Sequence, residues 1–158
     1  DMSLPLLPLC LCALNWHHAK LGTHDRLVRL VANSLIDGPR ALPPAEVHSD
    51  VPISELPASY GLSSHRNGQR RPDLVAADWA AGELLLIEVT IVPDAAVGRY
   101  VHRKLSKYAD LCRGDAPSGG LARRLDVVAV GTGGQLPPAS WLAFCRILSC
   151  ARDECQWL

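Results

Sequence analysis

The chain has 158 residues, of which 48% are hydrophobic and 20% are charged. This composition excludes a disordered or low-complexity protein, and a chain of this length folds as one domain that buries roughly 68–70% of its unfolded surface. Sixteen Lys and Arg residues balance sixteen Asp and Glu residues, so only local basic clusters could attract a polyanion. The six cysteines lie in an ordinary core composition, which predicts a reducing, intracellular compartment rather than a disulfide scaffold.

The N-terminal segment is apolar between residues 4 and 14. It is too short to span a bilayer, it contains two prolines, and no basic flank precedes it, so we expect no membrane segment. Because the chain begins with Asp1 rather than Met, we expect it to be the end of a longer polypeptide.

A first helix is predicted over residues 23–37, with Thr23 as its N-terminal cap and Gly38 as its stop. The next segment, residues 39–57, contains five prolines and little periodicity. We expect a long loop there, with at most a short edge strand at 51–56.

The second half of the chain alternates strands and helices. Residues 71–78 and 83–92 are rich in Val, Ile and Leu and predict a hairpin. A helix follows, ended by Gly114, with an apolar stripe formed by Val97, Val101, Leu105, Tyr108 and Cys112. A buried strand at 125–130, a turn at 131–134 and a helix opened by Pro137 and Pro138 complete the order α-(β)-β-β-α-β-α, which is an α/β fold.

The predicted hairpin places two carboxylates opposite each other. If Asp78 pairs with Glu83, then Asp73 lies opposite Glu88, with Cβ atoms about 4.5–5.5 Å apart, where like charges are destabilising. Glu88 also interrupts an apolar strand, and an unpaired buried charge costs several kcal/mol. A divalent cation would compensate both effects. The alternative is that Asp73 only begins a strand after Pro72, while Glu88 points to solvent.

Basic residues follow this pair on the helix at 97–112. Lys104 lies about 60° from the apolar stripe and can lean back toward the sheet, whereas Lys107 points farther toward water. These lysines, with Arg66, Arg70, Arg71, Arg99 and Arg103, could neutralise phosphates of DNA. The alternative is a solvated helix face.

These residues resemble the PD-(D/E)XK restriction-like nucleases, and among them the endonuclease domain at the C-terminal end of site-specific non-LTR retrotransposon proteins. The resemblance spans about residues 23–148 and rests on five elements in the family's order: His24-Asp25-Arg26, Arg71-Pro72-Asp73, Ile87-Glu88-Val89-Thr90, Lys104-Leu105-Ser106-Lys107-Tyr108, and the strand and turn at 125–134. It implies a restriction-endonuclease-like fold over residues 23–150, with a central mixed β-sheet flanked by helices. Residues 1–22 would form a linker or degenerate zinc-knuckle-like segment, and residues 151–158 a C-terminal tail.

The resemblance also implies roles for individual residues. Asp73 and Glu88 would bind Mg²⁺ or Mn²⁺, and because Thr90 stands where the family usually has a lysine, Lys104 or Lys107 would be catalytic. Arg70, Arg71, Arg99 and Arg103 would contact DNA, and the accessory candidates are His24, Asp25, Thr90 and Tyr108. Three of the accessory candidates have a structural alternative: the His24-Asp25 pair can complement the dipole of the helix at its N-terminus, and Tyr108 can be a core residue.

The activity implied is nicking of chromosomal target DNA in the nucleus, which leaves a 3′-hydroxyl for a reverse transcriptase continuous or associated with this chain. The alternatives are another nuclease of the same fold, or a catalytically inactive nuclease fold that binds nucleic acid or serves assembly as a transposon relic. Zinc is not expected. Cys10 and Cys12 are too close together for the usual pair of zinc ligands, and no further cysteine follows His17 and His18 at workable spacing to complete a set of four. The spacing of Cys145, Cys150 and Cys155 indicates no function.

Overall fold

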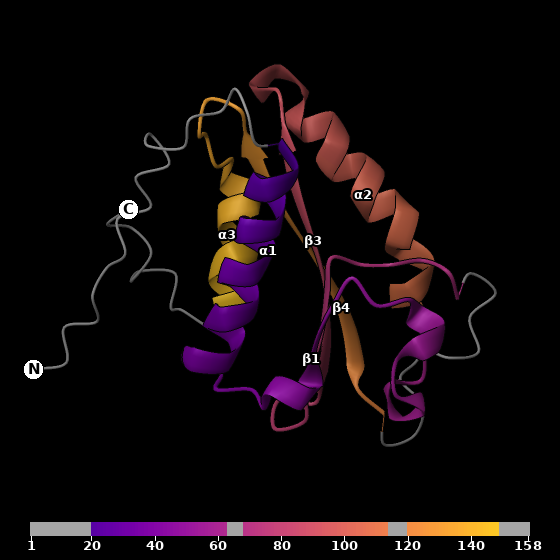
Figure 1. Ribbon diagram of the computed structural model, residues 1–158. Helices are drawn as coiled ribbons and strands as arrows, with labels where there is room; N and C mark the ends of the chain where they lie inside the picture. Colours follow the sequence, from indigo (N-terminus) through magenta and orange to yellow (C-terminus); the bar gives the residue numbers. More distant parts are fainter. Residues whose placement is uncertain (1–19, 63–67, 114–119, 149–158) are drawn as a thin grey trace, which may run out of the picture.

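A four-stranded mixed sheet with helices on both faces forms the centre of the structure (Figure 1). The computed structural model describes residues 20–62, 68–113 and 120–148. Its helices and strands are α1 (Lys20–Asp37), β1 (Val47–Ser49), β2 (Leu74–Asp78), β3 (Glu83–Val92), α2 (Val97–Cys112), β4 (Ala122–Gly131) and α3 (Pro138–Leu148). The strand order is β1-β2-β3-β4, in which β1, β2 and β3 are antiparallel neighbours and β3 runs parallel to β4.

The element order predicted from the sequence is confirmed. The hairpin, the helix at 97–112, the strand that follows it and the C-terminal helix all form at their predicted places. The turn at 131–134 also forms, closed by the Gly134 N–H, which donates to the Gly131 carbonyl at 2.8 Å. The chain is therefore an α/β protein with a mixed sheet flanked by helices.

Two local predictions in the N-terminal half are wrong. Thr23 does not cap α1, because the helix begins earlier, at Lys20, and Thr23 lies buried inside it. The short edge strand is β1 at Val47–Ser49 rather than at 51–56, where the chain forms a 3₁₀ turn after Pro52. Proline has no N–H to give to a ladder, so the proline-free segment pairs with β2 instead.

The two faces of the sheet carry separate cores. Helices α1 and α3 cover one face, where Leu85, Ile87 and Val128 are buried, and α2 covers the other (Figure 1). On the α2 side, Leu84 and Leu86 pack against Tyr108 and Leu111 of the helix and against the loop after β1. Strand β3 is covered on both faces, which explains its nearly continuous apolar sequence.

The predicted apolar stripe of α2 is wrong at Leu105, which is 41% exposed. The buried residues of α2 are Val97, Tyr108 and Leu111. Lys104 lies on the same face of the helix as these three residues, whereas Leu105, one residue later, points about 100° away from that face. A charged residue therefore occupies a sheet-facing position of α2.

Several expectations concern residues outside the described ranges. They are the zinc-knuckle-like residues Cys10, Cys12, His17 and His18, the phosphate-binding candidate Arg66, the helix stop Gly114, the cysteines Cys150 and Cys155, and the segments 1–19 and 149–158. In the described part of the chain, no helix has the length and apolar character needed to cross a membrane.

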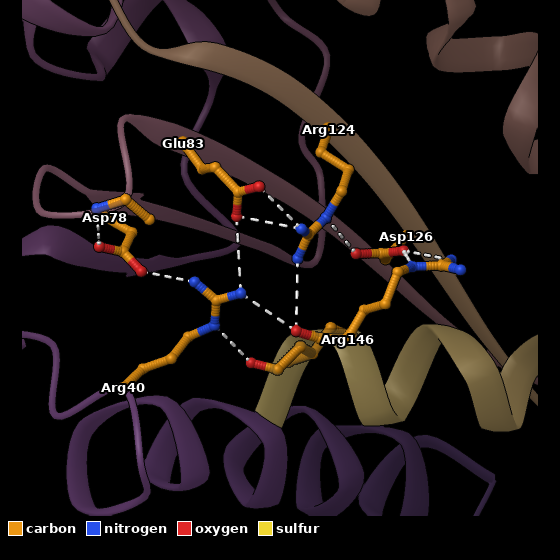
Figure 2. A network of polar contacts seen from close by, with 8 residues as sticks. Arg40, Asp78, Glu83, Arg124, Asp126 and Arg146 are labelled. Atoms are coloured by element: carbon orange, nitrogen blue, oxygen red, sulfur yellow. Dashed lines mark hydrogen bonds and ion pairs between the residues drawn. The ribbon is translucent and has the colours of Figure 1, made fainter. Parts of the chain in front are cut away.

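Arginines connect the helices to the hairpin end of the sheet (Figure 2). Arg40, which follows α1, forms an ion pair with Asp78 at the end of β2, and both side chains are buried. Its other nitrogens donate to the carbonyls of Ile147 at 2.8 Å and Arg146 at 3.1 Å. These carbonyls end α3 and lack partners within the helix. One side chain thus joins α1, the hairpin and α3.

A second group of ion pairs surrounds Asp126 on β4 (Figure 2). The Asp126 side chain is only 1% exposed. It accepts hydrogen bonds from Arg124 at 2.9 Å and from Arg146 at 3.1 and 2.7 Å. Arg124 also donates to both oxygens of Glu83 at 3.0 Å. The buried carboxylate therefore holds α3 against β4. Through Arg124 it also connects β4 to Glu83 of β3.

Replacing Asp126 with Ala should lower the free energy of unfolding by about 2–3 kcal/mol, because two arginines lose a buried counter-ion. Urea denaturation monitored by circular dichroism measures the effect. Glu55→Ala is the matched control. Glu55 is an exposed acid outside this network, so its removal should cost no more than about 0.5 kcal/mol. Equal losses in the two variants would contradict this account of the network.

Candidate functional site

The strand register places Asp73 and Glu88 as the sequence predicts. Asp78 pairs with Glu83, and the ladder continues to Leu74 opposite Ile87. Asp73 directly precedes this last pair, so continuation of the same register sets it opposite Glu88. Asp73 is partly exposed and Glu88 is fully buried. The interpretation in which Glu88 points to solvent is therefore wrong.

Asp73 and His24 complete the β3 backbone where β2 ends. In the continued register Val89 would face Pro72, which has no N–H to donate. Instead, the Val89 N–H donates to Asp73 Oδ2 at 2.7 Å, and His24 Nε2 donates to the Val89 carbonyl at 3.2 Å. The imidazole and the carboxylate consequently approach to 3.5 Å. This arrangement fixes Asp73 at the edge of the sheet.

The dipole interpretation of His24 and Asp25 is wrong. Because α1 begins at Lys20, neither residue lies in the first turn of the helix. His24 Nδ1 lies 3.3 Å from Asp25 Oδ1, while Nε2 faces Val89 and Asp73. The pair is thus placed beside the candidate site by the packing of α1 against β3.

Lys104 of α2 neutralises Glu88 on the face of the sheet that α2 covers. Its ammonium donates to Glu88 Oε2, and the lysine side chain is 22% exposed while that of Glu88 is 1% exposed. The second carboxylate oxygen, Oε1, is buried and has no hydrogen-bond partner among the described residues. Buried carboxylate oxygens normally have such partners. Glu88 therefore keeps one acceptor available for a ligand.

Tyr108 connects the two carboxylates to the basic side of the site. Burial, followed by the neighbouring Glu88 and Asp73 carboxylates, raises the pKa of Tyr108 far above its usual range. The hydroxyl remains protonated and donates to the Arg71 carbonyl at 2.9 Å. Lys107 Nζ donates to the same hydroxyl at 2.6 Å. Tyr108 is thus a core residue whose polar end lies in the site.

Two cavities adjoin these residues. One, of about 550 Å³, lies between α1 and the loop before β2, and its lining includes His24, Asp25, Arg29, Asp50 and Asp73. The other, of about 460 Å³, is lined by Gln69, Arg70, Arg71 and Lys107. Asp73 therefore faces a cavity directly, whereas Glu88 lines neither and lies behind Lys104.

The remaining predicted residues divide into engaged and exposed groups. Arg70 forms an ion pair with Asp110 at 2.5 Å. Arg99 and Arg103 lie on the exposed face of α2, where Arg103 stacks over the Tyr100 ring at 4.3 Å. Thr90 is partly exposed and shares the face of Glu88 by the alternation of β3. The structure thus gathers Asp73, Glu88, Lys104, Lys107 and Tyr108 and leaves the arginines of α2 at the periphery.

Sequence reasoning missed Ser49 and Asp50, which line the cavity beside Asp73. The Asp50 N–H donates to the Asp73 carbonyl at 3.2 Å, and Asp50 has a φ of 50°, a left-handed conformation that Asp tolerates better than most residues. Both residues lie at the end of β1 in the proline-rich connection. The length of that connection was the only signal that it had a role.

Comparisons with protein-family models, with curated proteins and with solved structures find no match to this chain.

Lys104→Met should lower the free energy of unfolding by about 2–3 kcal/mol at pH 7.5, because it leaves the buried Glu88 carboxylate without its cation. The double variant Glu88→Gln/Lys104→Met should recover more than half of this loss, as urea denaturation would measure. Lys107→Met, at an exposed lysine, should change stability by less than about 1 kcal/mol. If both lysine variants behave alike, the Glu88 ion pair does not stabilise the fold.

Tyr108 should make the fold sensitive to alkaline pH. Its pKa is raised in the folded state, so the stabilisation is complete below the ordinary value of 10.0 and declines as the pH rises above it, where only the unfolded chain ionises. Urea denaturation at pH 9, 10 and 11 should show that, between pH 9 and 11, the unmodified chain loses about 1.4 kcal/mol more of its free energy of unfolding than Tyr108→Phe does. Parallel pH profiles would contradict the folded-state shift.

Proposed function

We propose that this chain is a divalent-metal-dependent DNA endonuclease with a restriction-endonuclease-like fold of the PD-(D/E)XK type. In this proposal it nicks target DNA in the nucleus and supplies the 3′-hydroxyl from which the reverse transcriptase of a non-LTR retrotransposon primes synthesis. Two features support it: the α-β-β-β-α-β-α order around a mixed sheet, and the five motif elements that follow the family's order along the sequence.

The proposal depends most on the environment of Glu88. A fully buried carboxylate on the central strand carries one oxygen without a partner in the described part of the chain, beside Asp73 and in contact with a lysine. Both carboxylates raise the pKa of the Tyr108 hydroxyl, and the strand register sets the two residues opposite each other. Such a concentration of charge and unsatisfied acceptor is more typical of a reaction site than of a structural core.

The residues fit a hard cation such as Mg²⁺ or Mn²⁺. Glu88 Oε1 and Asp73 Oδ1 would hold it, since Val89 occupies only Oδ2 of Asp73. Among the described residues, no three His, Cys, Asp or Glu side chains come together as a metal-binding group. Mg²⁺ does not require one, because one or two carboxylates with waters and phosphate oxygens are its usual ligands. When bound, the ion would polarise a phosphate and lower the pKa of its water.

The chain's own side chains would divide the remaining work. The Lys104 ammonium lies beside Glu88 and would stabilise the negative charge that develops on the phosphoryl oxygens. It would replace the lysine that the family usually has at the position of Thr90. Arg71, Arg99 and Arg103 are exposed and would hold the phosphates of the duplex, with no contribution to sequence preference.

A second candidate function is supported by the same ion pair. Lys104 already neutralises Glu88, so this carboxylate has a cation without any metal. In that case the chain would be a catalytically inactive nuclease fold that binds nucleic acid or serves assembly. It would bind DNA in a salt-dependent manner and would not cleave it.

The nuclease proposal predicts that the purified chain nicks supercoiled plasmid DNA in the presence of Mg²⁺. Asp73→Ala and Glu88→Ala should each abolish nicking, and Lys104→Ala should slow it by about 10²–10³-fold. Agarose gels would follow the conversion to open circles, with thermal unfolding as the check of folding. Glu55→Gln is the matched control, since Glu55 is exposed and lies in the loop before the hairpin.

Nicking that survives both carboxylate substitutions would overturn the site assignment. DNA binding with no Mg²⁺-dependent nicking in the unmodified chain would favour the inactive module. Nicking by the unmodified chain and by Glu55→Gln alone would support the endonuclease.

A further inference from the structure

The cavity between Gln69 and Lys107 is strongly basic. Three of its four lining residues are cationic, Arg70, Arg71 and Lys107, and the fourth is an amide. Arginine and lysine present only hydrogen-bond donors. A cavity of about 460 Å³ with this lining is suited to an anionic group rather than to a cationic one.

The three cations differ in how far they are committed to other partners. Arg70 is held by Asp110 at 2.5 Å. Arg71 is half exposed. Its guanidinium lies 4.0 Å from the exposed Asp50 carboxylate, and solvent screening leaves little attraction between them. Lys107 Nζ gives one of its three N–H groups to the Tyr108 hydroxyl. Arg71 and Lys107 are therefore the two side chains that can bind an anion here.

Tyr108 ties this cavity to the candidate site. Its hydroxyl contacts Lys107 and the Arg71 backbone, while the adjacent Glu88 carboxylate acts on its pKa. The Tyr108 hydroxyl thus stands between Lys107 Nζ and the neighbourhood of the Glu88 carboxylate. An anion in the cavity would be close to the carboxylates and still separate from them.

The basic surface continues along α2. Arg99, Arg103 and Lys107 recur every four residues and are exposed, so they form one stripe on the outer face of the helix. The stripe leads away from the cavity. One anion in the cavity with further anions along α2 matches the regularly spaced phosphates of a polynucleotide backbone.

We propose that Arg71 and Lys107 form a binding site for the phosphate next to the scissile one in the DNA strand, with Arg103 and Arg99 contacting the phosphates that follow. The designation of a scissile phosphate rests on the proposed nuclease function; the phosphate-binding site itself does not. Lys107 is then a DNA-binding residue, and Lys104 is the lysine at the reacting centre. Arg70, although its side chain lines the cavity, remains engaged with Asp110.

The test measures the salt dependence of DNA binding in EDTA, which prevents metal-dependent cleavage. Fluorescence anisotropy of a labelled 20-base-pair duplex would be recorded between 50 and 200 mM KCl. Loss of two phosphate contacts in Arg71→Gln/Lys107→Gln should reduce the slope of log affinity against log salt by about 1.8. Between 50 and 200 mM KCl, the factor by which this variant loses affinity should accordingly be about tenfold smaller than the factor for the unmodified chain.

The matched control is Arg26→Gln/Arg113→Gln, which removes the same charge from exposed arginines outside the cavity and should leave the slope unchanged. The charge-conserving variant Arg71→Lys/Lys107→Arg should keep a slope near that of the unmodified chain. Equal slopes in the two glutamine variants, or no binding of the duplex by the unmodified chain, would overturn the phosphate site.

The outcomes separate this inference from the proposed function. A reduced slope only in Arg71→Gln/Lys107→Gln, with no nicking by any form of the chain, would support the phosphate site and reject the endonuclease. Nicking that depends on Asp73 and Glu88, with equal slopes in both glutamine variants, would support the endonuclease and reject the phosphate site.

Discussion

The buried charge of Glu88 is the constraint on which the site depends. A carboxylate on a strand covered on both faces loses its hydration, and several kcal/mol must be recovered from a cation and hydrogen bonds. Lys104 supplies the cation, and it can do so only if α2 turns that position toward the sheet. Tyr108 and Leu111 then complete the buried side, and Leu105 is left 41% exposed. The rotation of α2 thus reflects an electrostatic requirement as much as an apolar one.

A second constraint acts where β2 ends. Pro72 terminates the ladder because it cannot donate to β3, and the adjacent Asp73 and His24 satisfy the backbone groups of Val89 instead. The proline and the aspartate therefore act together: Pro72 ends the ladder at Val89, and Asp73 accepts the hydrogen bond from the Val89 N–H. This gives a physical reason for a Pro-Asp dipeptide at a strand end, and it fixes one carboxylate before any ligand is considered.

The sequence predicted the part of the site that follows from local periodicity. The pairing of Asp78 with Glu83 is enough to set Asp73 opposite Glu88, since strand register is fixed by the turn. It did not predict that Val47–Ser49 is the edge strand or that Leu105 is exposed, because both depend on packing between distant segments. Arg40 contacts Asp78 and Ile147, which are 38 and 107 residues away. No spacing pattern could indicate such pairs.

The balance of charge differs between the two faces of the sheet. On the face covered by α1 and α3, Asp78, Glu83 and Asp126 are paired with Arg40, Arg124 and Arg146, so three acids and three bases neutralise one another and connect α1, α3 and the strands. Equal totals of acidic and basic residues do not imply a uniform potential. Because these arginines are committed to structure, the solvent-facing cations that the described residues place beside the candidate site are those of Arg29, Arg71 and the outer face of α2. A chain without net charge can in this way keep a local positive surface while its other arginines hold the fold together.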